Sequence, residues 1–231
     1  MPSVLITGSN RGLGLEWSRQ YAKASWRVFA TCRHPEEADE LRQLAETCRT
    51  VSLHRLDVTD ADQISALANE LEHEPIDVLL NNAGVYYEKY APLEAPLDYQ
   101  AWTHTFQVNT MAALRMAKTF IGNLALSEKR LVVAISSHMG SIAEIDHPGS
   151  YFYRSSKAAL NAVMKGLSLE LKPLNIGVLL LHPGWVRTRM GGPDAPLLPE
   201  ESVRGMRKLI DEFTISNTAR FFRYNGTEIP W

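Results

Sequence analysis

Short apolar runs alternate along the chain with longer stretches in which apolar and polar residues are mixed in an amphipathic pattern. The first pattern is typical of strands buried on both faces of a parallel sheet, and the second of helices that cover such a sheet. The predicted strands are Ser3–Thr7, Arg27–Thr31, Val51–Leu56, Val78–Asn81, Leu131–Ser136 and Gly177–Leu181, with a seventh near Arg220–Arg223. The predicted helices are Gly12–Ala24, Glu36–Cys48, Asp60–Glu72, Tyr99–Leu126 and Tyr153–Leu171.

This alternation predicts an α/β protein with a Rossmann-type, doubly wound parallel sheet of six to seven strands and helices on both faces. At 231 residues the chain suits one sizeable core and is short for two, so we expect residues 1–231 to form a single domain. The stretch Gly191–Pro199 is rich in proline and glycine and is expected to form a loop before a last helix. That loop is either a lid or a plain surface connection.

Composition excludes several classes of protein. The 24 Lys and Arg residues nearly balance the 26 Asp and Glu residues, so we expect neither a nucleic acid nor an anionic membrane as partner. Two cysteines, Cys32 and Cys48, support neither a disulfide framework nor a zinc site, and no histidine pair has metal-binding spacing. No metal is predicted. The chain start lacks the features of a signal peptide, and no apolar run reaches the ~18 residues of a membrane helix, which predicts a cytoplasmic protein.

A glycine-rich turn follows the first predicted strand and leads into a helix: Thr7-Gly8-Ser9-Asn10-Arg11-Gly12-Leu13-Gly14. Glycines let the backbone turn sharply and approach a pyrophosphate, whose charge meets the free N–H groups at the helix start. The spacing Gly-x-x-x-Gly-x-Gly differs from the more common Gly-x-Gly-x-x-Gly. Taken alone, it also fits glycines that merely close a strand-to-helix turn.

Polar or glycine residues also follow three other predicted strands. Ligands of an open α/β sheet bind at the carboxyl ends of its strands, so these segments meet at the edge where a ligand is expected. Together with the glycine-rich turn they predict a dinucleotide site. The segments are Asp57-Val58, Asn81-Asn82-Ala83-Gly84 and His182-Pro183-Gly184.

Tyr153 and Lys157 are four residues apart at the start of a predicted helix, so both side chains project from one face. A free tyrosine has a pKa near ~10, and a neighbouring ammonium group is expected to lower it. Tyr151 has no such partner, because Ser155 stands four residues after it. Ser137 ends the fifth predicted strand, where its hydroxyl can bind a substrate oxygen. A Tyr–Lys pair alone is usually a solvated helix face, but its place beside a dinucleotide turn favours acid–base chemistry.

Taken together, these segments resemble the short-chain dehydrogenase/reductase family, and the resemblance covers the whole chain. The matching segments are Thr7-Gly8-x-x-x-Gly12-x-Gly14, Asp57-Val58, Asn81-Asn82-Ala83-Gly84, Asn109, Ser137-x-x-Gly140, Tyr153-x-x-x-Lys157 and Pro183-Gly184-x-Val186-x-Thr188.

The resemblance implies that Tyr153 is the general acid/base and that Ser137 orients the carbonyl. It implies that Lys157 binds the nicotinamide ribose while lowering the pKa of the tyrosine, and that Asn109 holds a relay water. It places Asp57 and Val58 at the adenine, Asn82 along the cofactor cleft, and Val186 and Thr188 at the nicotinamide carboxamide. The cofactor-binding residues expected in total are Gly8, Asn10, Arg11, Gly12, Leu13, Gly14, Arg33, Asp57, Val58, Asn82, Ala83, Gly84, Tyr153, Lys157, Pro183, Gly184, Val186 and Thr188.

A finer resemblance, to the C-factor-like carbonyl reductase branch, rests on the segment 182–192 and on the chain end at Phe221-Phe222 and 228–231. Three features depart from that pattern. Arg189 stands where an acidic residue is expected before Met-Gly-Gly, and Ser25 stands where glycine usually ends the first helix. Sixteen positions separate Ser137 from Tyr153, more than is usual, so the residues around 145–151 are expected to reshape the pocket rim.

The end of the second predicted strand indicates which nicotinamide cofactor the site binds. An NAD enzyme is expected to carry an acidic residue there for the ribose 2′-OH, whereas this chain has Cys32 followed by Arg33. Arg33 and Arg11 suit a 2′-phosphate, because guanidinium groups bind phosphate in a bidentate manner. We therefore expect NADP(H). In the alternative, Arg33 only forms a surface salt bridge with Glu36 or Glu37.

The function predicted is NADP(H)-dependent interconversion of a carbonyl (aldehyde or ketone) and an alcohol by hydride transfer. The alternative is a dinucleotide-binding signalling or regulatory protein of the C-factor type with little turnover. Two further features have open interpretations. Apolar residues of the Tyr99–Leu126 helix, together with the Tyr153 helix, form either a homodimer interface or ordinary core: Trp102, Phe106, Met111, Leu114 and Met116. A second set lines an aromatic substrate pocket or packs within loops: Tyr86, Tyr87, Tyr90, His138, Met139 and Trp185.

Overall fold

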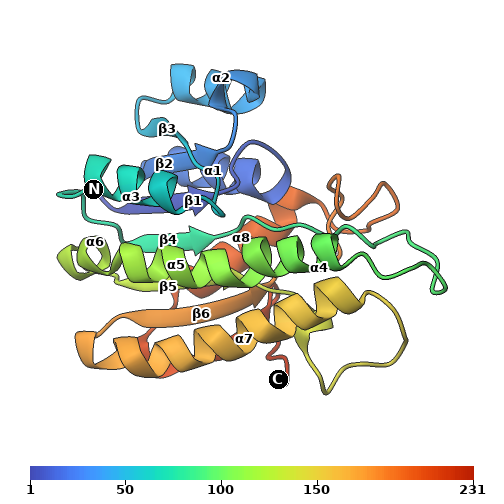
Figure 1. Ribbon diagram of the computed structural model, residues 1–231. Helices are drawn as coiled ribbons and strands as arrows, with labels where there is room; N and C mark the ends of the chain where they lie inside the picture. Colours follow the sequence, from blue (N-terminus) through green and yellow to red (C-terminus); the bar gives the residue numbers. More distant parts are fainter.

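Seven parallel strands form the central sheet of the protein, in the order β3-β2-β1-β4-β5-β6-β7 (Figure 1). The computed structural model describes residues 1–231. The doubly wound sheet predicted from the sequence is confirmed, and the seventh strand belongs to it. The strands are β1 (Ser3–Thr7), β2 (Arg27–Cys32), β3 (Val51–Arg55), β4 (Val78–Asn81), β5 (Leu131–Ile135), β6 (Gly177–His182) and β7 (Arg220–Arg223).

Strands β1, β4, β5 and β6 are buried along their whole length, which explains why their sequences are continuous apolar runs. Their ends differ from the predicted ones by at most one residue. β2 and β6 each run one residue further than predicted, to Cys32 and His182, while β3 and β5 end one residue earlier. Cys32 is consequently buried at the end of β2, and both cysteines are free.

The sheet separates two hydrophobic cores, one under each layer of helices (Figure 1). Helices α3, α5 and α7 contribute to the first core, and α1, α2 and α8 to the second. No helix is both long enough and apolar enough to cross a membrane. The helices are α1 (Gly12–Lys23), α2 (Asp39–Thr47), α3 (Ala61–Glu70), α4 (Tyr99–Phe106), α5 (Ala112–Thr119), α6 (Ile121–Leu126), α7 (Tyr151–Leu171) and α8 (Pro199–Asp211).

The single helix predicted over Tyr99–Leu126 is wrong in detail. The segment forms α4, a π-helical turn (Gln107–Met111), α5 and α6. The wide turn contains Asn109, whose side chain bonds outside the helix to the backbone of Val85. A π turn adds one residue to a helix without ending it, so the apolar pattern on either side remains typical of a helix.

Several other helix ends also differ from the prediction, and the starts of α2 and α7 are examples. Helix α2 begins at Asp39, because Pro35–Glu37 forms a separate 3₁₀ turn before it, and α7 begins at Tyr151, two residues early. Ser25, just beyond α1, has a φ of 59°, a left-handed conformation that glycine adopts without cost. Ser25 therefore ends the first helix less favourably than glycine would, as expected from the sequence.

Candidate active site

The glycine-rich turn forms a cradle at the carboxyl end of β1. Gly8 and Gly12 have φ values of 71° and 54°, in the left-handed region that favours glycine. A Cβ atom on Gly14 would overlap the carbonyl oxygen of Gly8, so only glycine fits there. Helix α1 begins at Gly12, and no side chain caps it. The N–H groups at its start are therefore left without a side-chain acceptor, which suits them to a phosphate.

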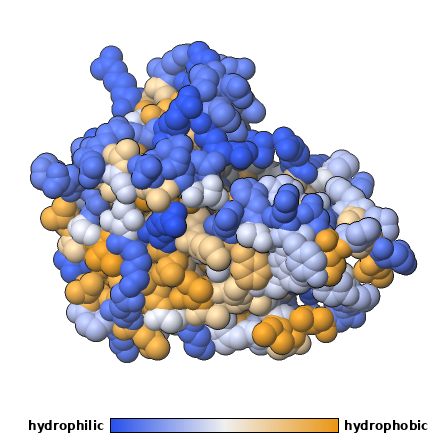
Figure 2. Space-filling view, viewed as in Figure 1, coloured by the Kyte–Doolittle hydropathy of each residue, from blue (hydrophilic) through white to orange (hydrophobic).

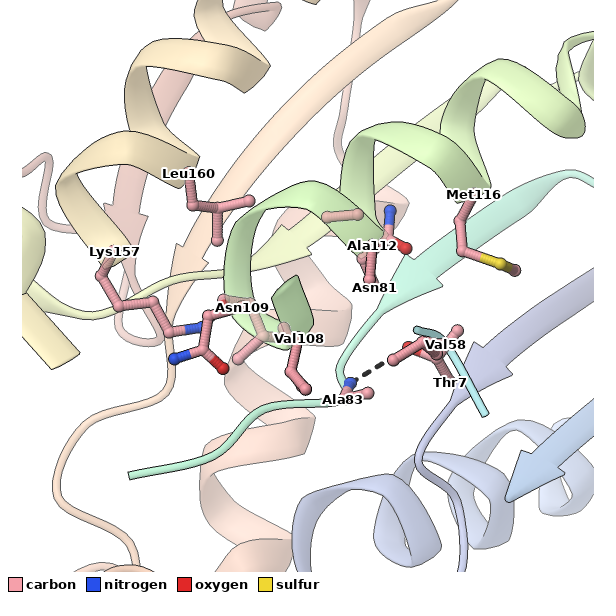
Figure 3. A pocket seen from close by; sticks show the side chains of 12 residues that line it. Thr7, Val58, Asn81, Ala83, Val108, Asn109, Ala112, Met116, Lys157 and Leu160 are labelled. Atoms are coloured by element: carbon pink, nitrogen blue, oxygen red, sulfur yellow. Dashed lines mark hydrogen bonds between the residues drawn. The ribbon is translucent and has the colours of Figure 1, made fainter. Parts of the chain in front are cut away.

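The segment after β4 is bonded to this turn. The Asn82 side-chain amide donates to the carbonyl oxygens of Thr7 (2.8 Å) and Gly8 (3.2 Å). The Thr7 hydroxyl accepts the backbone N–H groups of Asn82 and Ala83, each at 3.0 Å; Figure 3 shows the bond to Ala83. Asn82 thus fixes the shape of the cradle through its side chain, a role that differs from the cofactor contact implied by the family resemblance.

Helix α7 places Tyr153 and Lys157 next to the end of β5. Both are buried, with 9% and 4% of their surface exposed. The Lys157 Nζ donates to the carbonyl oxygen of Ile135, the last residue of β5, at 2.8 Å. A Cβ atom on Gly140 would come within 2.8 Å of the Lys157 carbonyl carbon, so the turn that starts at Ser137 packs directly on α7. The structure therefore brings the three predicted catalytic side chains to one place.

Asn109 lies beside Lys157 (Figure 3). Its Oδ1 accepts the N–H of Val85 (2.8 Å), and its Nδ2 donates to the Val85 carbonyl (3.0 Å) and to the Ser156 hydroxyl (3.0 Å). A Cβ atom on Gly84 would lie 3.4 Å from Asn109 Oδ1 and 3.8 Å from Lys157 Nζ. Asn109, Lys157 and the segment after β4 therefore meet at one point, next to the glycine-rich turn.

The electrostatics of the pair differ from the expectation that Lys157 lowers the pKa of Tyr153. Burial raises the pKa of Tyr153 to about 12, and interaction with the Ser137 hydroxyl only partly opposes this shift. The Lys157 ammonium group points at the Ile135 carbonyl and lies 5.8 Å from the centre of the tyrosine ring. Burial also lowers the pKa of Lys157 to about 8. Desolvation is thus the dominant effect on both groups. At neutral pH the phenol is protonated, as a proton donor must be.

Tyr86 and Glu88 both contact Tyr153. Tyr86 was considered from the sequence for an aromatic pocket or loop packing, whereas Glu88 was missed. The ring of Tyr86 stacks on that of Tyr153, with centroids 4.2 Å apart, and its hydroxyl bonds to Ser150. Glu88 Oε1 accepts the backbone N–H of Tyr153 at 2.7 Å. Ser150 belongs to the long segment between Ser137 and Tyr153, so this segment takes part in the site. The only signal for Tyr86 and Glu88 in the sequence is their place just after the Asn-Asn-Ala-Gly segment.

The six residues considered for an aromatic pocket do not form one cluster. Tyr86 packs on Tyr153, whereas the His138 ring packs edge-on against His182, with centroids 4.7 Å apart. Tyr90 and Trp185 are exposed. Of these residues, only Tyr86 stacks on Tyr153, so the pocket interpretation stays a prediction for that residue.

The loop between β6 and α8 contacts both the segment after β4 and the glycine-rich turn. Lys89 Nζ donates to the carbonyl oxygens of Met190 (2.6 Å) and Gly191 (2.7 Å). The Trp185 indole also donates to Gly191 O, at 2.8 Å. Thr188 in this loop lies against Gly12 of the glycine-rich turn. Because the loop spans both halves of the site, these contacts favour the lid interpretation over a plain connection. We call residues 185–198 the lid loop.

Arg33, the residue that follows β2, has no acidic partner. Glu36, the partner considered for Arg33, pairs with Arg55 at 2.9 Å and lies 3.6 Å from His34. Arg33 is exposed and is free to bind a ligand. Arg11 precedes the start of α1, and its pKa is lowered by burial and by the nearby charges of Arg189 and Arg33.

Comparisons with known proteins show the family to which the chain belongs. A model of the short-chain dehydrogenase family matches residues 2–196. The chain belongs to the short-chain dehydrogenase/reductase family. It is 43% identical to the C-signal of Myxococcus xanthus over 166 residues, which are 72% of this chain and 99% of that protein, so the finer resemblance is confirmed as well. It is 31% identical to a 1-hydroxy-2-glutathionyl-2-methyl-3-butene dehydrogenase of Rhodococcus over the full length of both chains.

Two solved structures of this family share the whole architecture. The carbonyl reductase Sniffer of D. melanogaster matches with a TM-score of 0.93 and 33% identity, over 100% of both chains. An NADPH-bound carbonyl reductase from chicken fatty liver matches with a TM-score of 0.92 and 30% identity, over 100% of this chain and 99% of that one.

The buried charge of Lys157 generates a prediction about stability. Because burial lowers its pKa from 10.5 to about 8, charging it opposes folding by an amount on the order of 3 kcal/mol below pH 8. This opposition fades between about pH 8 and 10.5. Lys157→Met is therefore expected to raise the melting temperature at pH 7 by several degrees, and the gain is expected to shrink towards pH 10.5. Thermal unfolding at both pH values measures this.

Lys172→Met serves as the control, since Lys172 is exposed at the end of the same helix. It is expected to leave the melting temperature nearly unchanged. A lower melting temperature for Lys157→Met than for the wild type at pH 7 would show that the Lys157 side chain stabilises the fold.

Proposed function

We propose that this protein is an NADP(H)-dependent oxidoreductase that interconverts an aldehyde or ketone with an alcohol. One observation carries the proposal: a buried, protonated tyrosine lies beside Ser137 and Lys157, next to a glycine cradle with free helix N–H groups. The similarity to carbonyl reductases, one of them solved with NADPH, supports both the reaction and the cofactor.

Each side chain of the cluster has a role in this reaction. NADPH supplies the hydride when bound. Tyr153 gives its proton to the carbonyl oxygen, and the Ser137 hydroxyl donates a hydrogen bond to the same oxygen and orients it. Lys157, whose pKa is lowered to about 8 and which is therefore mostly charged at pH 7, binds the ribose and returns a proton towards Tyr153. Asn109 keeps the π turn and the segment after β4 together at Lys157. The family resemblance also assigns it a relay water.

The residues for the cofactor follow from the same edge of the sheet. The segment from Gly8 to Gly14 binds the phosphates, Asp57 and Val58 lie towards the adenine, and Ala83 and Gly84 line the cleft. Pro183, Gly184, Val186 and Thr188 bind the nicotinamide end. Thr188 lies against Gly12, which supports a continuous path from the phosphates to the nicotinamide.

A second candidate function is a dinucleotide-binding signalling protein with little turnover. The identity of 43% to a protein named C-signal favours it. The enclosed Tyr153, Lys157 and Ser137 favour chemistry instead, because binding alone does not require a buried proton donor next to a buried lysine.

We expect one domain and a cytoplasmic location. We also propose a homodimer, for which Figure 2 gives support, because apolar surface lies over α5, α6 and α7. Met111, Leu126 and Leu169 are exposed in this region, whereas Met116 is core. Light scattering at micromolar concentration decides whether the particle contains one chain or two.

The experiment that tests the function is the oxidation of NADPH and of NADH with a panel of aldehydes and ketones, followed by absorbance. We expect kcat/KM with NADPH to exceed that with NADH by about 10- to 100-fold, since each charge-assisted bond to the 2′-phosphate contributes about 1.5–3 kcal/mol. Arg33→Asp is expected to shift the preference towards NADH. Equal efficiencies in the wild type, or an unchanged preference in the variant, would refute the cofactor assignment. No turnover with any carbonyl would favour the signalling function.

A further inference from the structure

Arg189, in the lid loop, is an exposed residue that neither the sequence pattern nor the proposed reaction explains. It replaces the acidic residue expected at this position, so the local charge is reversed. Its guanidinium group makes no hydrogen bond or ion pair within the protein, and the same holds for Arg11 and Arg33. Most other arginines pair with a carboxylate or a carbonyl oxygen, as Arg55 does with Glu36.

The backbone contacts bring Arg189 to the glycine-rich turn. Thr188 Cγ2 would lie 3.4 Å from a Cβ atom on Gly12. Arg11 immediately precedes Gly12, and Arg189 immediately follows Thr188, so the two arginines come from neighbouring backbone positions of two different segments.

Arg189 is held in this position by the lid loop itself. Gly192 N donates to Thr188 O at 2.8 Å, and Gly191 N donates to the Thr188 hydroxyl at 3.1 Å, which closes a tight turn around Arg189. Lys89 binds the carbonyl oxygens of Met190 and Gly191 from the other side. The turn is therefore built into the site.

Ser9 N donates to Thr31 O at 2.8 Å, which holds the end of β2, and with it Arg33, beside the glycine-rich turn. Three guanidinium groups without a carboxylate partner therefore come from segments that meet at this turn. Arg189 and Arg33 are both close enough to lower the pKa of Arg11, with Arg189 having the larger effect. The three positive charges repel one another, and a dianion bound among them offsets this repulsion. The planar donors of arginine suit the oxygens of a phosphate.

We propose that Arg189 joins Arg11 and Arg33 in binding the 2′-phosphate of NADPH, so that the lid loop itself carries part of the cofactor selectivity. The proposal rests on the NADP(H) function proposed above. Binding of the 2′-phosphate also draws the lid loop towards the glycine-rich turn, because the phosphate interacts with charged groups of both segments.

The test is the dissociation constant of NADPH and of NADH, measured by fluorescence titration without any carbonyl substrate. Arg189→Gln is expected to weaken NADPH binding about 10-fold and NADH binding less than 2-fold, since a charge-assisted bond to one phosphate is lost. Arg189→Asp restores the expected acidic residue and is expected to weaken NADPH binding further. The difference between wild type and Arg189→Gln is expected to shrink as salt is raised, because exposed charges are screened.

Arg204→Gln is the matched control, as Arg204 is exposed on α8 and has no partner. It is expected to leave both dissociation constants unchanged. Unchanged NADPH binding in Arg189→Gln would overturn the proposal, and so would an equal loss for NADH and NADPH, which would indicate a general effect on the lid loop. Either result, together with a preference for NADPH that Arg33→Asp abolishes, would leave the proposed function standing. A wild type without preference for NADPH would refute both.

Discussion

The position of helix α7 against the end of β5 is the constraint on which the rest of the site depends. Lys157 reaches back to the Ile135 carbonyl, and Gly140 leaves no space between the Ser137 turn and the helix backbone. Thr110 and Asn109 of the π turn bond to Ser156 on another face of α7. The helix is therefore held by β5 and by the π turn at once. This arrangement fixes Tyr153 relative to Ser137, but it does so by burying an ionisable pair.

That burial changes the pKa of both groups and also opposes folding. Desolvation keeps the Tyr153 phenol protonated by raising its pKa, and it lowers the pKa of Lys157 towards the working range. The protein thus holds a proton donor and a second, more acidic proton source within one enclosed space. A charged lysine in this position opposes folding, because burial disfavours the ammonium form.

The carboxyl edge of the sheet joins the acid–base group to the cofactor cradle through loops rather than through core packing. Asn82 ties the segment after β4 to the glycine-rich turn, and the same segment continues to Tyr86 and Glu88, which contact Tyr153. Lys89 then binds the lid loop. One stretch of chain therefore connects the cradle, the acid and the lid.

The sequence predicted the features that follow a regular pattern or that involve residues close together along the chain. Continuous apolar runs predicted β1, β4, β5 and β6 most clearly, because a strand buried on both faces contains few polar residues. The i, i+4 spacing predicted that Tyr153 and Lys157 share a face. The π turn at Asn109 was missed because one inserted residue hardly changes a helical pattern. Local spacing also cannot predict contacts between segments that are distant in the sequence. Such contacts are the bonds of Asn82 to the glycine-rich turn, the stacking of Tyr86 on Tyr153 and the approach of Arg189 to Arg11.

The proposed reaction requires the buried Tyr153 phenol to supply the proton for carbonyl reduction. The most direct test is Tyr153→Phe, followed in single turnovers of NADPH oxidation with the best carbonyl substrate, alongside the dissociation constant of NADPH. Tyr153→Phe keeps the ring that stacks on Tyr86, so the fold is expected to persist. The account predicts a fall in rate of roughly 10²- to 10⁴-fold, with NADPH binding changed less than about threefold. A rate within a few-fold of the wild type would contradict it and would mean that another group moves the proton.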